Sequence, residues 1–149
     1  MNIHFDDSDF QDKLSKIVRH AFPERVERGL GVAMLDLLND CIMEVPTVPI
    51  KEGWLRGSGS IFVQNRLVKT SVNIGRGKDK YANTDYIGRI NKDGYEGVIG
   101  FNAPYSAKMH EGIGLQFTEP SSGAKFLESK IVRKKEVYIK DIADTIKAG

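Results

Sequence analysis

A histidine and a glutamate, His110 and Glu111, stand side by side in the segment APYSAKMHEG. An imidazole next to a carboxylate can act as a general acid–base pair or can supply two metal ligands. A helical zinc hydrolase motif needs a second histidine three residues after the glutamate, and Gly114 occupies that position. The other two histidines, His4 and His20, lie near the start of the chain. We therefore expect no metal site, and a small hydrolase that uses the His-Glu pair is kept as an alternative.

Other catalytic motifs in the sequence are incomplete. The pair Gly77-Lys78 lacks the earlier glycine of a phosphate-binding loop, and Asp79 stands where serine or threonine would bind magnesium. In the run GSGS, residues 57–60, no serine has glycines two positions away on both sides. The sequence therefore predicts no catalytic residues and no cofactor, and we expect a protein that is not an enzyme.

Basic residues are concentrated in the later part of the chain. Residues 1–50 contain nine acidic and five basic side chains (5 − 9 = −4), and residues 51–149 contain eleven acidic and seventeen basic ones (17 − 11 = +6). Such a chain can pair with copies of itself or present basic surface to nucleic acid. The folded protein can equally distribute these charges evenly. A non-specific DNA-binding accessory protein is therefore a second alternative, with the cluster over Lys130–Lys135 and a basic loop as its phosphate contacts.

The elements that position these residues can be predicted from periodicity. Apolar residues at helical spacing predict a first helix that ends near His20, and Pro23 is well placed to begin a second helix with a broad apolar face. Two prolines make the segment from Val45 to Gly53 an extended connector. Alternation over Leu67–Gly75 predicts a half-buried strand, which we expect to pair with strands over 60–64 and 95–101.

These elements predict an α+β fold in a single domain over residues 1–149. An antiparallel sheet of three to five strands is expected to pack against N-terminal and C-terminal helices, because consecutive strands are flanked by helical segments. The expected ranges are 1–44 for the N-terminal helices, 58–101 for the sheet with a long loop at 75–94, 104–111 for a short helix and 124–147 for the C-terminal helix.

The composition indicates a protein without a membrane span. No apolar run approaches the ~20 residues that cross a bilayer, and the acidic first residues lack a signal-peptide pattern. The single cysteine, Cys41, cannot form an internal disulfide, which fits a reducing cytoplasm.

Three segments together resemble the head–tail connector proteins of long-tailed bacteriophages, which are also called neck, tail-completion or minor capsid proteins. The segments are VPIKEGWLRGSGSI, GVIGFNAPYSAKMHEGIG and GAKFLESKI, which occur in the family's order between residues 45 and 131. The matching residues are Val48, Pro49, Gly53, Leu55, Arg56, Ser58, Gly100, Pro104, Tyr105, Ala107, Glu111, Gly114, Phe126 and Leu127. A hydrophobic residue often stands in the family where His110 lies, so the resemblance leaves the role of that histidine open.

The resemblance implies a structural virion protein without catalysis. It implies a homo-oligomeric ring, often of six subunits, that sits in the neck of the virion and assembles in the host cytoplasm. The implied partners are other copies of the chain, a portal, adaptor or head-completion protein, a tail-tube or terminator protein, and the DNA that crosses the channel. Our candidates for contact with subunits or DNA are Arg76, Lys78, Lys80, Arg89 and Glu111. The candidates for structural motif positions are Gly53, Leu55, Arg56, Pro104, Tyr105, Phe126 and Leu127.

Overall fold

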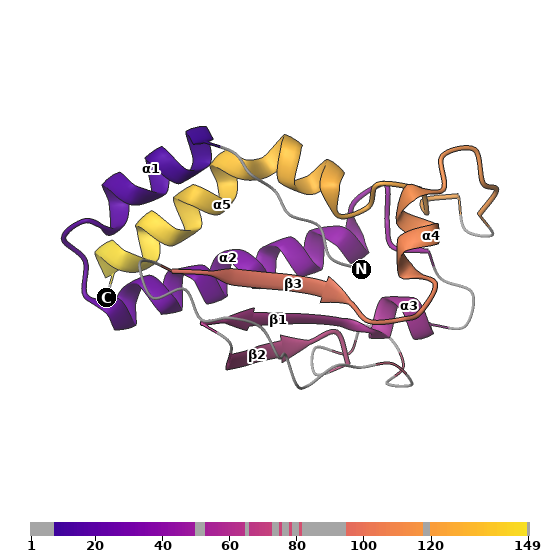
Figure 1. Ribbon diagram of the computed structural model, residues 1–149, viewed down its shortest axis with the longest axis horizontal. Coiled ribbons are helices and arrows are strands. Elements are labelled where there is room, and N and C mark those ends of the chain that lie inside the picture. The colour runs from indigo at the N-terminus through magenta and orange to yellow at the C-terminus, as the bar shows by residue number, and fades with distance from the viewer. Residues whose placement is uncertain are drawn as a thin grey trace.

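The chain folds into three layers, in which α2 lies between a pair of helices and a β-sheet (Figure 1). This computed structural model describes residues 8–49, 53–64, 66–72, 75, 78, 81, 95–117 and 120–148. Their elements are α1 (Ser8–Val18), α2 (Pro23–Met43), α3 (Trp54–Gly57), β1 (Gly59–Val63), β2 (Arg66–Thr70), β3 (Gly97–Phe101), α4 (Ser106–Glu111) and α5 (Glu128–Ala148). The sheet is antiparallel and the helices lie N-terminal and C-terminal to it, so the predicted α+β class is confirmed.

Helix α2 forms the centre of the molecule. It begins at Pro23, as predicted, because proline has the backbone angle of a first helical residue and needs no N–H partner there. Its buried residues cover more than one narrow stripe, since α5 packs on one side and strands β1 and β3 pack on the other. They are Val26, Gly29, Leu30, Ala33, Leu37, Leu38, Cys41 and Ile42.

The sheet has the order β2-β1-β3. The central strand β1 is buried along its whole length and pairs with β3 in regular register, with Ile61 opposite Ile99. Strand β2 differs from the prediction, because its first four residues are exposed and it ends at Thr70. The predicted strand is therefore present and pairs with β1, but its expected half-burial and its expected end at Gly75 are wrong. Helix α2 covers β1 and β3, and β2 extends past the part of the sheet that the helix covers.

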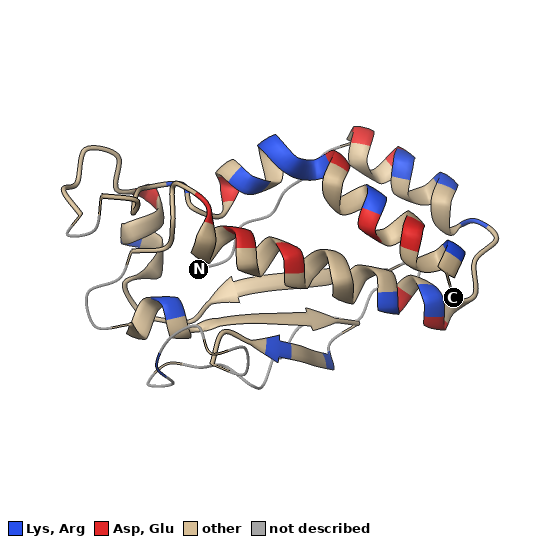
Figure 2. Cartoon of the chain, turned by 180° about the vertical axis from the view of Figure 1, so that it is seen from behind, with Lys and Arg blue, Asp and Glu red and all other residues tan. Residues whose placement is uncertain are grey.

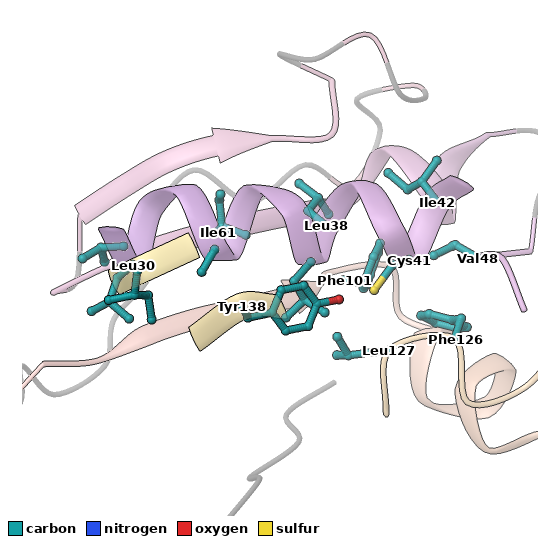
Figure 3. Close-up of a cluster of buried hydrophobic side chains, with 14 of the residues drawn as sticks. Leu30, Leu38, Cys41, Ile42, Val48, Ile61, Phe101, Phe126, Leu127 and Tyr138 are labelled. Carbon is teal, nitrogen blue, oxygen red and sulfur yellow. The ribbon is translucent and has the colours of Figure 1, made fainter. Parts of the chain in front are cut away.

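The hydrophobic core joins α2, the sheet and α5 (Figure 3). Ile61 and Phe101 from the sheet meet Leu38 from α2, and each is almost completely buried. Full burial of one such side chain contributes about 1.5–3 kcal/mol of transfer free energy. Phe126 and Leu127, which precede α5, are also buried, so these two resemblance positions have a packing role.

The C-terminal helix is shorter at its start than predicted, and it is interrupted. It begins at Glu128 rather than near Ala124, because Lys125 has a positive φ of 60° that no regular helix accommodates. Lys134 has non-helical angles (φ −119°, ψ 16°), so α5 consists of two helical pieces. The short helix α4 likewise begins two residues later than expected, at Ser106.

Candidate interaction site at the junction of α3, α4 and α5

Helix α4 places His110 inward and Glu111 outward. The His110 ring is fully buried and stands edge-to-face on Phe126, with ring centroids 5.0 Å apart. Its Nε2 accepts a hydrogen bond from the backbone N–H of Glu128 at 3.2 Å, so Nδ1 carries the proton and donates to Glu111 Oε1 at 2.8 Å. Glu128 is the first residue of α5. The imidazole therefore satisfies one of the N–H groups that the start of a helix leaves without an intrahelical partner.

Glu111 connects the same junction on the outside. Its carboxylate accepts hydrogen bonds from Lys125 Nζ and from His110, and Lys125 also pairs with Glu128 at 3.1 Å. The hydrogen bond from Lys125, followed by the one from His110, lowers the pKa of Glu111. In this arrangement the carboxylate is ionised and both ring nitrogens of His110 are engaged. The pair therefore fixes α4 to the start of α5.

The segments that carry the family resemblance converge at this end of the molecule. Gly53 takes a positive φ of 86° just before α3, where glycine has no steric penalty. Leu55 is buried, and Arg56 donates to the carbonyl oxygen of Val48 in the preceding connector at 2.9 Å. Pro104, which is exposed, precedes Tyr105 at the entry to α4.

Three aromatic rings connect α3 with α4. Trp54 stands edge-to-face with Tyr81 at 6.3 Å between centroids, and Tyr81 does the same with Tyr105 at 6.2 Å. Edge-to-face pairs at this separation are favourable beyond the area that they bury. Sequence patterns reveal little of this cluster, because its members lie far apart, at positions 54, 81 and 105, and α3 is too short to show periodicity.

Of the predicted basic candidates, Lys78 is the one that lies within the described residues. Its backbone N–H donates to Gly53 O at 3.1 Å, and its side chain is exposed. A Cβ added at Gly57 would lie 2.0 Å from the Lys78 carbonyl oxygen, so glycine at that position allows this segment to lie directly on α3. Arg76, Lys80 and Arg89 lie outside the described residues, as does most of the 75–94 loop. The grouping of these four cations therefore stays a prediction.

The basic cluster over Lys130–Lys135 is occupied within the chain. Lys130 is fully buried, and its Nζ donates to the carbonyl oxygens of Pro46 at 2.6 Å and Phe126 at 2.9 Å, while burial lowers its pKa. The other three cations form ion pairs that join α5 to α1 and α2: Lys134 with Asp40 and Glu44, Arg133 with Glu44, and Lys135 with Asp9. Figure 2 shows the basic start of α5 beside the acidic end of α2.

These ion pairs change the interpretation of the charge asymmetry. Acidic residues of the first fifty neutralise basic residues of the last twenty, so this cluster is not the free phosphate-binding surface that the sequence suggested. The sequence did not indicate the structural role of buried Lys130. One of its two carbonyl partners, Pro46, is 84 residues away in the chain.

The residues that the structure describes form neither a metal-binding cluster nor a membrane-spanning helix. Among those residues, no group of three or more His, Cys, Asp or Glu side chains is placed to hold a metal ion. No helix formed by them combines the length and the apolar character that crossing a bilayer requires.

Comparisons of the chain with protein-family models, with curated proteins and with solved structures found no match.

Proposed function

We propose that this chain is a structural virion protein of a tailed phage, a head–tail connector that forms a ring between the portal and the tail tube. The observation that carries the proposal is the convergence of the resemblance segments. They come from residues 53–56, 104–111 and 126–127. Tyr81 links Trp54 of α3 with Tyr105 at the entry to α4, and His110 of α4 stands edge-to-face on Phe126, just before α5. A set of motif residues that fixes the relative positions of three helices fits a protein whose task is to present surfaces in a defined geometry.

The proposal includes the partners and the place of action. The chain acts without catalysis in the neck of the virion and assembles there from the host cytoplasm. Its neighbours are further copies in a ring, often of six, a portal, adaptor or head-completion protein, and a tail-tube or terminator protein. The loop over 75–94 supplies the basic residues that contact genomic DNA or adjacent subunits.

The experiment that tests this function is deletion of the gene from its phage, followed by electron microscopy of the lysate. Filled heads and complete tails that fail to join are the expected result, and expression of the wild-type chain from a plasmid should restore joined particles. Intact infectious particles from the deletion phage would remove the neck role.

Complementation with His110→Gln separates this function from that of a hydrolase. Glutamine has an oxygen that can accept from the Glu128 N–H and an amide that can donate to Glu111, but it cannot act as a general base. A structural role predicts that the variant restores joined particles once its thermal unfolding shows that it folds. Loss of particle joining by a folded variant would favour chemistry at His110.

The basic loop has its own test. Replacement of Arg76, Lys78, Lys80 and Arg89 by glutamate should reduce assembly or DNA retention, while the circular dichroism spectrum stays that of the wild-type monomer. Normal particle yield from this variant would contradict the assigned role of the loop.

A further inference from the structure

An apolar groove of about 560 Å³ runs between α2 and β2. Its floor includes Val32, Leu67 and Val68, which are 39%, 38% and 38% exposed. Leu35 and Val63 continue the apolar lining, and charged side chains border it. Strand β2 is also an edge strand of the sheet, so this region combines exposed aliphatic surface with an open strand.

A matching apolar projection lies in the turn after α4. Ile113 is 80% exposed and Leu115 is 42% exposed. Backbone hydrogen bonds shape this turn, from Ile113 N–H to Glu111 O at 2.8 Å and from Leu115 N–H to Gly112 O at 3.0 Å. The isoleucine is therefore held outward by ordered backbone, which reduces the conformational entropy that binding would cost.

The elements that form the groove, β2 and the first half of α2, lie apart along the long axis from the turn after α4, which is at one end of the molecule (Figure 1). The groove is formed by the first half of α2 and by β2, whereas the projection follows α4. They are therefore positioned to meet between two copies. Because the two surfaces are different, each copy that contributes its projection still has a free groove, and the contact propagates into a closed ring or a filament.

The charges beside the two surfaces are complementary. Arg28 and Lys69 border the groove, are exposed, and form no ion pair with another described residue. Glu24 also lies on this border, and Glu27 is neutralised by its ion pair with Arg66. The groove thus has three cations and two anions. Beside the projection, Glu111 and Glu128 share the cation Lys125, so this cluster keeps one net negative charge, and the ionised Glu111 side chain is 57% exposed.

We propose that Ile113 and Leu115 of one copy occupy the α2–β2 groove of a second copy, with Glu111 facing Arg28 and Lys69. A turn of a few residues in a groove buries less than the roughly 1,200 Å² of a stable protein interface. A single contact is therefore weak, and the assembly gains stability when several contacts close a ring. The proposal deepens the ring of the proposed function, but it concerns self-association and can be tested on the purified chain.

Cross-linking between engineered cysteines tests the contact. The double variant Ile113→Cys/Val68→Cys is treated with a short bis-maleimide and analysed by denaturing electrophoresis. Native Cys41 gives little background, because it is buried and burial raises the pKa of its thiol to about 12. A head-to-tail contact predicts a ladder of dimers, trimers and larger products, whereas each single-cysteine variant stops at a dimer.

The matched control is Ile113→Cys/Val132→Cys, in which the second cysteine replaces an exposed valine of α5 outside the groove. The proposal predicts that this control forms trimers and larger products at least several-fold more slowly. Absence of a ladder from the test variant, or equal rates for the test and control variants, would overturn the contact.

Charge reversal gives a second measurement on the same cysteine pair. Adding Glu111→Lys should lower the cross-linking rate roughly threefold, the effect of one ion pair at the rim of an interface. Adding Lys69→Glu as well should restore much of the loss, and failure of that rescue in a folded variant would argue against the proposed orientation.

The contact and the neck function can fail separately. A missing ladder together with unjoined heads and tails in the deletion phage would overturn this contact and leave the neck function standing. A ladder together with intact particles from the deletion phage would support the contact and remove the neck function.

Discussion

The two sides of α2 show how one helix can be both a rigid core element and part of an open surface. Toward α5, a Cβ at Gly29 would lie 3.1 Å from the carbonyl oxygen and 3.2 Å from the Cα of Ile142, so the two backbones are in close approach. Toward β2, a Cβ at Gly31 would meet Val68 Cγ1 at 3.8 Å, which is an ordinary contact. The α5 side therefore has little room for change, and the β2 side can accept additional atoms.

Polar groups differ between the two sides in the same way. On the α5 side, Tyr138 donates to Asp40 Oδ2 at 2.8 Å, and Lys134 donates to the same oxygen at 2.9 Å. On the β2 side, Arg28 and Lys69 stand at the rim of an apolar groove without an ion pair in the described chain. Lys134 and Tyr138 on the α5 side thus have partners within the chain, whereas Arg28 and Lys69 on the β2 side are available to a partner molecule.

Truncation of the core at the α2–α5 crossing should have the largest effect on stability. Ile142 is 1% exposed, and Ile142→Ala removes buried methyl groups and leaves a cavity, at a cost of about 3 kcal/mol. The matched change on the open side, Leu67→Ala, should cost less than about 1 kcal/mol because Leu67 is already partly hydrated. Urea unfolding followed by circular dichroism measures both values. Equal losses would mean that the β2 side is as closely packed as the crossing.

Alanine at the two glycines of α2 should change stability in opposite directions. Alanine favours helix by up to ~1 kcal/mol over glycine, so Gly31→Ala should raise the free energy of unfolding. At Gly29 the added methyl group pushes against the Ile142 backbone, and overpacking costs typically about 1–3 kcal/mol. Gly29→Ala should therefore lower the free energy of unfolding by about 1 kcal/mol net. Thermal and urea unfolding of the two variants measure the difference, and stabilisation by both would contradict the close approach.

Much of the element order was predictable because its signals are local. Pro23 and the helical spacing of apolar residues define α1 and α2, and an apolar run defines β3 close to its observed bounds. The exposure of β2 was not predictable. Leu67 and Val68 are apolar wherever the strand lies, and the sequence does not say that α2 covers β1 and β3 instead of β2. Helix α3 has four residues and is too short for any periodicity to appear.

The candidate site was predictable in its residues and less so in their roles. His110 and Glu111 were identified from adjacency, but the Glu128 N–H that fixes the histidine tautomer lies 18 residues away. For the same reason the sequence places Lys134 in a cluster of candidate phosphate contacts, because its partners Asp40 and Glu44 are about ninety residues distant. Long-range pairing of polar groups depends on the folded arrangement, and local sequence does not specify it.

The α2–α5 interface should also respond to pH through Asp141. Burial, followed by hydrogen bonding with Asp36, raises the pKa of this carboxyl from 3.8 to about 7, and the charges of Asp40 and Asp144 act in the same direction. The native state therefore keeps a proton that the unfolded chain releases, so stability should fall as the pH rises from about 4 to about 7. Because the site is partly open to solvent, we expect the loss attributable to Asp141 to be about 1 kcal/mol.

Asp141→Asn should remove that component of the pH dependence. Asparagine carries no charge, so the variant should gain about 1 kcal/mol over wild type at pH 8 and nothing at pH 4. Asp12→Asn, at an exposed position of α1 and not among the charges that act on Asp141, is the matched control and should leave the slope unchanged. Free energies of unfolding measured across this pH range decide the point, and equal slopes for Asp141→Asn and wild type would contradict the assignment.

The smallest expected difference concerns cations on the two sides of α2. Lys134→Gln removes partly buried ion pairs with Asp40 and Glu44, which should cost about 0.5 kcal/mol at low salt and less at high salt. Lys69→Gln should leave the free energy of unfolding unchanged, because Lys69 has no ion pair within the described monomer. Urea titrations at two ionic strengths measure both.

The same Lys69 variant should nevertheless weaken cross-linking between copies, since on the β2 side the charge acts between molecules. If Lys69→Gln changes monomer stability and leaves cross-linking unchanged, the Lys69 charge acts within the monomer, as the Lys134 charge does. The proposed difference between the β2 side and the α5 side of α2 would then be wrong.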